Sequence, residues 1–357
     1  MPSFAVRTPQ LEYQAHVERG IAARAQAFLP PNRSKVFVVT TEAVWRHQGH
    51  RLSEGFADTA FTKLVLPSGE EHKRLVQIER LACEMASGGA DRLSLVVAFG
   101  GGVVTDMAGF LAAIFMRGIP VLQVPTTLLA QVDAAVGGKT GANLAVGKNL
   151  IGCFHPPAAV LIDPAMVDSL PEREYVAGLY EVIKHGVIAS EPLFALLESR
   201  RERVLAREAP EVDEMVRESV RIKAEVVTAD EREHGIRKSL NFGHTFGHAL
   251  EAETGYTQFL HGEAVGWGML AAVELADLTG MLCRQDANRI RGVVRSYGAM
   301  PSLEAVSPEA IFSRLAADKK TQHGRVHFVL PMRIGEVAVR SDVPENAVRQ
   351  AILRALA

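Results

Sequence analysis

Three histidines that could bind a metal occur within eighteen residues, each beside a glycine. His244 and His248 stand four positions apart, so they share one face if their segment is helical. His261 follows, with Glu263 two positions later. Two histidines, one carboxylate and open positions are typical of a catalytic zinc site, whereas structural sites are closed. The spacing does not decide whether His244 or His248 would bind. Any one of these histidines taken alone is more typical of a protein core than of a metal site, and the three together make the two interpretations about equal.

Charged residues elsewhere in the second half could complete such a site. Glu181 and Lys184 are three positions apart and would lie on one face of a helix. Lys223 and Arg237 flank an acidic stretch that includes Glu233. Taken alone, that stretch is typical of a solvated, charged helix.

A glycine-rich loop in the first half is the candidate for phosphate binding. Gly100-Gly101-Gly102-Val103 follows an apolar run and precedes an apolar helical pattern from Met107 to Phe115. Glycines allow close approach of a ligand to the backbone, and free N–H groups at a helix start favour phosphate. For three glycines alone, a tight turn without a ligand is an equal alternative. The loop lacks the G-x-G-x-x-G pattern of dinucleotide-binding folds, so this motif does not by itself indicate NAD.

Cationic and hydroxyl side chains follow this loop within about fifty residues. Lysines beside glycines, a threonine pair and an arginine are suited to holding anions, and several together favour phosphate recognition over surface turns. We therefore predict a system of anion-binding loops from Arg117, Pro125–Thr127, Asp133, Gly137–Asn143 and Gly147–Asn149.

The elements that must position these residues fall into two halves. Short apolar runs at 36–40, 63–66, 93–99, 119–124 and 159–162 alternate with helical patterns, which predicts a parallel sheet covered by helices. After residue 170 the pattern is mainly helical, with two late β-like runs at 325–330 and 336–340. We predict an α/β domain over 1–170 and a mainly α-helical domain over 171–357.

Composition excludes several classes of protein. The net charge of −2 over 357 residues provides no excess of positive charge with which to bind nucleic acid or an anionic membrane. Three scattered cysteines argue against a disulfide framework. The chain shows neither a signal-peptide pattern nor an apolar run long enough to span a bilayer. We expect a cytoplasmic protein without a nucleic-acid or membrane partner.

Together the motifs resemble the dehydroquinate synthases of the sugar phosphate cyclase superfamily, over nearly the whole chain. The similar segments are GGGVVTDMAGFLAAIFMRG from residue 100, PTTLLAQVDAAVGGKTGAN from 125, GKNLIGCFHPP from 147, LPEREYVAGLYEVIKHG from 170, LNFGHTFGHALE from 240, HGEAV from 261 and DKK at 318–320. The resemblance implies a Rossmann-like NAD-binding domain followed by a helical domain that binds metal and substrate.

The resemblance also implies the reaction and the role of each residue. A heptulosonate phosphate would become 3-dehydroquinate and phosphate, in the shikimate pathway, through transient oxidation by NAD, phosphate elimination, re-reduction and aldol closure. Zinc is the expected metal, with cobalt as an alternative, and a homodimer is the expected assembly. The implied metal ligands are Glu181, His244 and His261; the implied catalytic residues are Glu233, His248 and Lys184; the implied substrate-binding residues are Arg117 from a neighbouring subunit, Lys139, Asn149, Lys223, Arg237, Asn241 and Lys319 (or Lys320); the implied NAD-binding residues are Glu70, Lys73, Gly101, Gly102, Val103, Asp106, Thr126, Thr127, Asp133, Lys139 and Lys148.

Three alternatives remain open at the level of sequence. A polyol dehydrogenase related to glycerol dehydrogenase would share the fold and the metal site, but would not need the lysines and arginines as anion clamps. A cyclase that makes an amino-dehydroquinate or a valiolone is a second alternative, and a non-catalytic binding protein is a third. Thr41 departs from the family because it stands where an aspartate beside the adenosine ribose is frequent.

Overall fold

The computed structural model describes residues 1–9, 11–298, 300–321 and 326–357, and the side chains of 316–321 are not among those described. The chain divides into two compact units, each made of two stretches of sequence. Unit 1 is Met1–Pro171 with Val212–Glu231, and unit 2 is Glu172–Glu211 with Arg232–Ala357. The sequence pattern does not predict the return of the second stretch to unit 1. The assignment of NAD to residues 1–170, and of metal and substrate to 171–357, remains a prediction.

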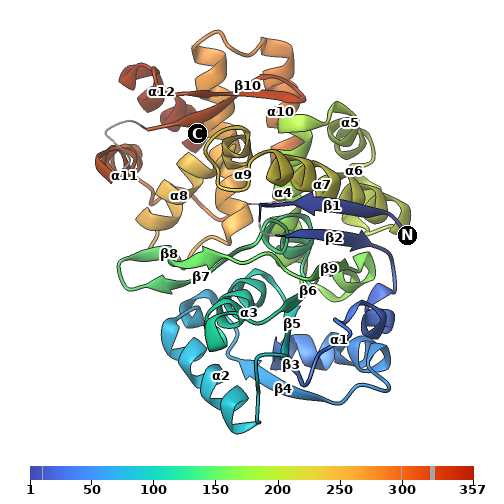
Figure 1. The fold of residues 1–357 in the computed structure, drawn as a ribbon. Helices are drawn as coiled ribbons and strands as arrows, with labels where there is room; N and C mark the ends of the chain where they lie inside the picture. Colours follow the sequence, from blue (N-terminus) through green and yellow to red (C-terminus); the bar gives the residue numbers. More distant parts are fainter. Residues whose placement is uncertain (10, 299, 322–325) are drawn as a thin grey trace. The chain divides into compact units, whose positions relative to one another are not determined.

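Unit 1 is built around a seven-stranded sheet, as Figure 1 shows. Its strands are β1 (Ser3–Arg7), β2 (Glu12–Val17), β3 (Val36–Thr41), β4 (Phe61–Leu66), β5 (Leu95–Gly100), β6 (Val121–Pro125) and β9 (Ala159–Ile162). Their order is β1-β2-β9-β6-β5-β3-β4. All neighbours pair in parallel except β1, which is antiparallel to β2 at the edge. The predicted parallel α/β sheet is therefore confirmed, and β1 and β2 extend it beyond the predicted strands.

Helices cover both faces of this sheet, which explains why its central strands read as unbroken apolar runs. On one face, α2 (Leu75–Ser87) and α3 (Gly102–Ile114) share an apolar core with the strands. On the other, η1 (Ile21–Phe28) and α1 (Glu42–Gly55) form a second core (Figure 1). Short helical turns complete the unit at η2 (Glu70–His72), η3 (Phe115–Arg117), η4 (Ala130–Ala134) and η5 (Pro164–Ser169).

The central strands β3, β5 and β6 end at one edge of the sheet. Gly100 at the end of β5 lies opposite Pro125 at the end of β6, and Thr41 ends β3. The Thr41 hydroxyl accepts a hydrogen bond from the Val44 amide at 3.2 Å and so caps α1. Ligands of open α/β sheets bind outside the carboxyl ends of the strands, and this edge carries the glycine-rich loop and the threonine pair.

The segment predicted to form anion-binding loops is instead largely a β-hairpin. Strands β7 (Lys139–Leu144) and β8 (Gly147–Phe154) pair antiparallel, with Lys139 opposite Phe154. The prediction of loops was wrong for residues 139–144 and 147–154, because glycines and lysines do not by themselves indicate a loop. They are compatible with a strand whose partner supplies the backbone hydrogen bonds.

The returning stretch of unit 1 is most of helix α7 (Ala209–Ala229). Arg19 forms an ion pair with Asp213 at 2.8 Å, and the Thr228 hydroxyl accepts a hydrogen bond from the Arg7 amide at 3.1 Å. Both contacts join α7 to the N-terminal part of the chain. Lys223 therefore belongs to the same unit as the glycine-rich loop.

Unit 2 is mainly helical, as predicted, with one two-stranded sheet (Figure 1). Helix α9 is buried along Gly262–Ala276, which agrees with its nearly continuous apolar sequence. Among the described residues, no helix combines the length and the apolar character needed to cross a bilayer. The elements of unit 2 are α4 (Glu172–Ala189), α5 (Glu191–Ser199), α6 (Arg201–Leu205), η6 (Ile236–Asn241), α8 (His244–Glu253), α9 (His261–Leu278), α10 (Arg284–Ser296), α11 (Pro308–Thr321), β10 (Phe328–Arg333), β11 (Glu336–Arg340) and α12 (Glu345–Leu356).

Candidate active site

Three helices of unit 2 bring together the side chains predicted to bind a metal. Glu181 lies in the middle of α4, His244 begins α8 and His261 begins α9. One ligand atom from each side chain lies within 4.8 Å of the others, so the group has the spacing of a metal site. The Glu181 side chain is fully buried, whereas 33% of the His261 side chain is exposed. The group is therefore buried on one side and accessible on the other.

The Glu181 carboxylate faces both histidines without bonding to either. Its Oε1 atom is 3.6 Å from His244 Nε2 and 3.7 Å from His261 Nε2, which is too long for hydrogen bonds. Within the described part of the chain, this oxygen has no hydrogen-bond partner. Ligand atoms around tetrahedral zinc, with bonds of about 2.0–2.1 Å, lie about 3.3–3.4 Å apart. The two distances from Glu181 Oε1 exceed this value by only a few tenths of an ångström, and all three ligand atoms lie within 4.8 Å of one another, so a divalent cation fits the group after a small contraction.

Residues next to His244 and His261 stabilise the first turn of the helix that each histidine begins. Gly243 precedes α8 with a φ of 82°, and the backbone carbonyl of Phe242 lies 3.2 Å from His244 Nδ1. At the start of α9, Glu263 Oε2 accepts a hydrogen bond from the Leu260 amide at 2.8 Å. Arg173 holds the same carboxylate, with Nε 2.6 Å from Oε1. A glutamate that reaches back to an N-terminal amide stabilises the first turn, and here that turn carries His261.

Lys184 forms a buried ion pair with Glu181. Its Nζ atom lies 2.5 Å from Glu181 Oε2, and the side chains are 1% and 0% exposed. Burial of two charges costs desolvation energy that their attraction barely offsets, so such a pair is weak evidence for a stabilising role. Its position beside the two histidines instead favours the predicted role in catalysis.

A second group with metal-ligand spacing overlaps the first. It consists of His248, Glu251 and His261. The His248 ring lies 5.5 Å from the His244 ring and 5.8 Å from the His261 ring, measured between centroids. His248 is exposed, while Glu251 is 1% exposed. The structure thus places His248 beside the predicted metal ligands, where a proton-transfer residue is expected.

Three further candidates of unit 2, Glu233, Arg237 and Asn241, lie close together in the chain, and two of them are joined by a hydrogen bond. Asn241 Nδ2 donates a hydrogen bond to Glu233 Oε1. Glu233 has a φ of 62°, a left-handed conformation that is uncommon for a residue with a side chain. Arg237 lies between them on η6 and is 1% exposed. Strained backbone of this kind persists only where its surroundings enforce it, and it is concentrated at functional sites.

The glycine-rich loop of unit 1 forms a cradle at the start of α3. A Cβ atom on Gly101 would lie 2.9 Å from the Thr127 side chain, so only glycine fits there without movement. Thr126 is 3% exposed, and its hydroxyl has no hydrogen-bond partner among the residues that the structure covers. Gly102 and Val103 form the first turn of α3, whose amides are free to meet an anion. These features fit the phosphates of a dinucleotide.

A hydrogen-bond network around the buried Lys73 includes Glu70 and Asp106, which were also predicted to bind the cofactor. Lys73 is 4% exposed, and its Nζ atom donates to Asp106 at 2.5 Å and to Asn149 at 2.6 Å. Asn143 Nδ2 donates to Glu70 at 2.7 Å. Burial alone would lower the pKa of Lys73, but the charges of Asp106 and Glu70 outweigh it and raise that pKa. Asn149 was predicted to bind the substrate phosphate, yet here its side chain contacts a residue of the cofactor group.

Two further cations of unit 1 have defined surroundings. Lys223 forms an ion pair with Asp133, which joins a predicted substrate-binding residue to a predicted cofactor-binding one. Arg117 is exposed and has a φ of 71°, next to Met116 with a φ of 47°. Two successive left-handed residues that are not glycine indicate a backbone held in an unfavourable shape. This conformation supports a specific role for Arg117.

For the remaining lysine candidates, the structure indicates a position in the fold but not a role. Lys139 is exposed at the start of β7, and Lys148 is partly exposed on β8. Lys319 and Lys320 belong to α11, but their side chains lie outside the described residues.

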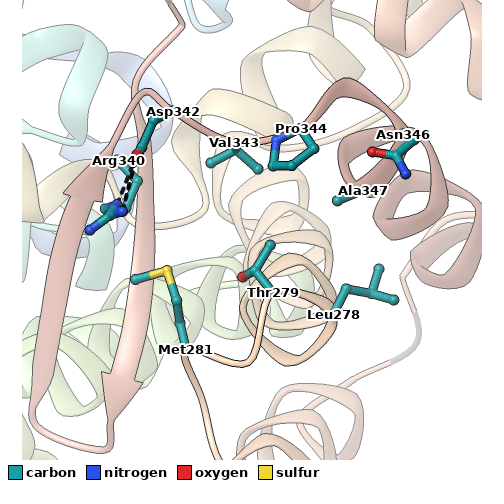
Figure 2. A pocket seen from close by; sticks show the side chains of 9 residues that line it. All are labelled: Leu278, Thr279, Met281, Arg340, Asp342, Val343, Pro344, Asn346 and Ala347. Atoms are coloured by element: carbon teal, nitrogen blue, oxygen red, sulfur yellow. Dashed lines mark hydrogen bonds and ion pairs between the residues drawn. The ribbon is translucent and has the colours of Figure 1, made fainter.

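A hollow elsewhere in unit 2 offers no comparable chemistry. Figure 2 shows it between the end of α9 and the segment that leads into α12, with Leu278 and Pro344 in its lining. Its two charged residues, Arg340 and Asp342, pair with each other at 2.8 Å. The lining contains no histidine, cysteine or lysine, so we do not assign a function to it.

Comparison with known proteins identifies the family. The family described as 3-dehydroquinate synthase N-terminal matches residues 63–177, and that described as 3-dehydroquinate synthase C-terminal matches residues 178–321. A 3-dehydroquinate synthase of Solibacter usitatus is 58% identical over 357 residues, which span all of both chains. The chain belongs to the 3-dehydroquinate synthase family. The predicted family is thus confirmed.

Solved structures of sugar phosphate cyclases share the fold. The 2-epi-5-epi-valiolone synthase ValA of Streptomyces hygroscopicus, solved with NAD+ and Zn2+ bound, has a TM-score of 0.89 and 29% identity over 98% of each chain. A 2-deoxy-scyllo-inosose synthase, solved with carbaglucose-6-phosphate, NAD+ and Co2+, has a TM-score of 0.88 and covers 99% of each chain. At 24% identity, this second likeness shows the fold alone. The predicted fold class of a 3-dehydroquinate synthase is confirmed.

Two residues around these groups were not predicted from the sequence: Glu251 beside His261 and Arg173 on Glu263. Asn143 was predicted only as part of an anion-binding loop, and its hydrogen bond to Glu70 was not predicted. Glu251 had a signal, because it follows His244 and His248 on one helical face in an otherwise apolar stretch. Arg173 had none, since its partner lies 90 positions away.

Proposed function

We propose that this chain catalyses the conversion of 3-deoxy-D-arabino-heptulosonate 7-phosphate to 3-dehydroquinate and inorganic phosphate. It would thus be a carbon–oxygen lyase of the shikimate pathway that leads to aromatic amino acids. The observation that carries the proposal is 58% identity over the full length to a 3-dehydroquinate synthase. The convergence of Glu181, His244 and His261, which lie on three helices, supports it independently.

The proposed cofactors are NAD and one divalent metal ion, zinc in the first instance and cobalt as an alternative. The cradle of unit 1 and the Glu181 group of unit 2 both have buried polar atoms left for a ligand, and the ValA structure contains NAD+ and Zn2+. When bound, NAD would accept and return a hydride, and the metal would polarise a substrate hydroxyl. Glu70, Lys73, Asp106 and the residues of the cradle would hold NAD.

The protein side chains would orient the substrate and move its protons. Lys184 is held beside Glu181, where its ammonium group would stabilise negative charge on a substrate oxygen. Glu233, held by Asn241, would transfer protons, and so would the exposed His248. Lys223 and Arg237 would bind the substrate carboxylate, and Lys139, Asn149, Asn241 and Lys319 would bind the phosphate.

The proposed assembly is a homodimer in the cytoplasm, with Arg117 serving the neighbouring subunit. The exposed side chain of Arg117 and its left-handed backbone support this role. Measurement of molar mass in solution, followed by mixing of inactive Arg117→Ala and His261→Ala chains, would test it. Partial recovery of activity in the mixed dimer is expected, because one of its two sites would then be intact.

A phosphate-release assay tests the function. With the heptulosonate phosphate and catalytic NAD, the enzyme should release phosphate without accumulating NADH and should lose activity on treatment with a chelator. His261→Ala should lose at least about 100-fold in kcat, since a ligand of the polarising metal is gone. Activity that survives both the chelator and the substitution would refute the metal assignment.

The same assay separates the alternatives. Accumulation of NADH with a simple polyol would indicate a dehydrogenase. Parallel assays with the amino-substituted heptulosonate phosphate and with a heptulose phosphate that lacks the carboxylate separate the other cyclases, because each product must come from a substrate of matching composition.

A further inference from the structure

His261 has a second carboxylate neighbour that none of the proposed roles uses. Glu251 lies on α8, and its Oε2 atom is 3.4 Å from His261 Nδ1. The other ring nitrogen of His261, Nε2, faces Glu181 Oε1 at 3.7 Å. Both carboxylates are buried, with side-chain exposures of 2% for Glu251 and 0% for Glu181. The imidazole therefore has one carboxylate at each nitrogen.

This arrangement defines which nitrogen is available to a metal. A neutral imidazole has a proton on one nitrogen and a lone pair on the other. If Glu251 accepts the Nδ1 proton, the lone pair of Nε2 points toward Glu181. His244 is arranged in the same sense, because its Nδ1 lies 3.2 Å from the Phe242 carbonyl and its Nε2 faces Glu181. A carboxylate is the stronger acceptor, so it would also make His261 the more basic ligand.

We propose that Glu251 is a positioning residue for the metal: it accepts the Nδ1–H of His261 and thereby holds Nε2 toward Glu181. The inference rests on the proposed function, since it requires a metal at Glu181, His244 and His261. It adds a residue that touches neither the metal nor the substrate. Its effect is carried by the orientation and basicity of one ligand.

The geometry disfavours the alternative in which Glu251 is itself a ligand. That group would consist of His248, Glu251 and His261. His248 is exposed, and Glu181 Oε1 would then remain buried without a hydrogen bond from any described residue. Burial of an unpaired carboxylate oxygen is costly, and a metal bound to Glu181 removes that cost.

The test measures metal affinity, which a merely structural glutamate would not change. Zn2+ and Co2+ dissociation constants are obtained by competition with a chromophoric chelator, and the visible absorption of bound Co2+ reports its coordination. Glu251→Gln keeps an acceptor but loses the charge, and Glu251→Leu removes both. We expect losses of roughly 10-fold and 100-fold in affinity, the range known for such outer partners of metal ligands.

The matched control is Glu274→Gln. Glu274 is a buried glutamate on α9 that pairs with Arg291 at 2.6 Å, and the dissociation constant should not change in this variant. The apo-protein unfolding midpoint is measured for every variant. If the Glu251 variants lower that midpoint but bind metal like the wild type, the role is structural and the inference is overturned.

Two further variants separate this inference from the proposed function. Glu181→Gln should lose metal binding, and His248→Ala should keep most of it. If His248→Ala loses binding and Glu181→Gln keeps it, the metal lies in the second group, and both the proposed metal assignment and this inference fail. If Glu181→Gln loses binding while both Glu251 variants keep wild-type affinity, only the inference fails. Should Glu251→Leu not fold, the Glu251→Gln affinity decides alone.

Discussion

Replacement of Gly262 by alanine should disable the metal group without touching any of its ligands. Gly262 follows His261 in the first turn of α9, and α9 packs there against α4. A Cβ atom on Gly262 would lie 1.9 Å from the backbone oxygen of Ala177. Ala177 is one turn before Glu181 on α4, so the clash falls between two of the helices that carry the ligands.

The structure sets the size of the perturbation. Ordinary contact begins at 3.4 Å, so α4 and α9 would have to separate locally by about 1.5 Å from the 1.9 Å position. Because the obstructing atom is backbone, no side-chain rotation can relieve the clash. Overpacking of this kind costs about 1–3 kcal/mol or more of folding stability. A misplacement of about 1 Å in a catalytic group can reduce the rate by about 100-fold.

Three measurements on Gly262→Ala check this reasoning: Zn2+ affinity, the free energy of unfolding of the apo-protein, and kcat for phosphate release. All three should fall. Gly292→Ala is the matched control, because Gly292 is exposed within α10 and has no atom within 4 Å of the added Cβ. That substitution should stabilise the protein by about 0.5–1 kcal/mol and leave metal affinity unchanged. Wild-type affinity and activity in Gly262→Ala would show that the contact between α4 and α9 does not set the ligand geometry.

Two further predictions concern catalysis and pH. In Glu233→Gln the side chain can still accept the hydrogen bond from Asn241, so KM should change little. It can no longer transfer a proton, so kcat should fall by about 100- to 10,000-fold. An unchanged kcat would exclude Glu233 as a proton-transfer residue. Folding raises the pKa of Lys73 above its usual value of 10.5. The charged form of Lys73 therefore stabilises the folded protein fully below pH 10.5, and this stabilisation is lost as the pH rises through the higher pKa of the folded state. Denaturant titrations of the wild type at increasing pH should show this loss of stability. Lys73→Met should lack the pH dependence and be less stable by about 3–5 kcal/mol near pH 8. Lys63 is partly exposed and pairs with Glu42, so the control Lys63→Met should behave like the wild type.

The sheet of unit 1 was predictable because its central strands are buried on both faces. Apolar runs without alternation mark β3, β5, β6 and β9 in the sequence as they stand in the structure. The hairpin of β7 and β8 was not predictable in this way, since its strands mix glycine, polar and apolar residues without an unbroken apolar run and depend on each other for pairing. The return of α7 to unit 1 was not predictable either. An amphipathic pattern shows that one face is buried but not which surface covers it.

The candidate metal ligands were likewise only partly predictable from the sequence. Spacing brought His244 and His248 onto one face of a helix but could not choose between them, and the choice came from resemblance. The structure supplies a physical reason for that choice: His244 is 8% exposed and directs Nε2 at Glu181, whereas His248 is exposed. Glu181 itself could not be found by spacing, because 63 positions separate it from His244 and only the packing of α4 brings it near.

The pairing of Glu181 with Lys184 bears on why this group would suit an anionic, oxygen-rich substrate. A carboxylate ligand normally offsets part of the charge of a metal ion, which weakens its pull on a bound hydroxyl. Here the Lys184 ammonium lies 2.5 Å from that carboxylate and offsets its charge. A divalent ion in this group would therefore keep more of its positive charge than beside an unpaired carboxylate, in a setting where Glu181 and Lys184 are shielded from water. Lys184→Met should therefore bind the metal at least as tightly as the wild type while losing kcat, and parallel losses of both would show that Lys184 serves only to hold Glu181.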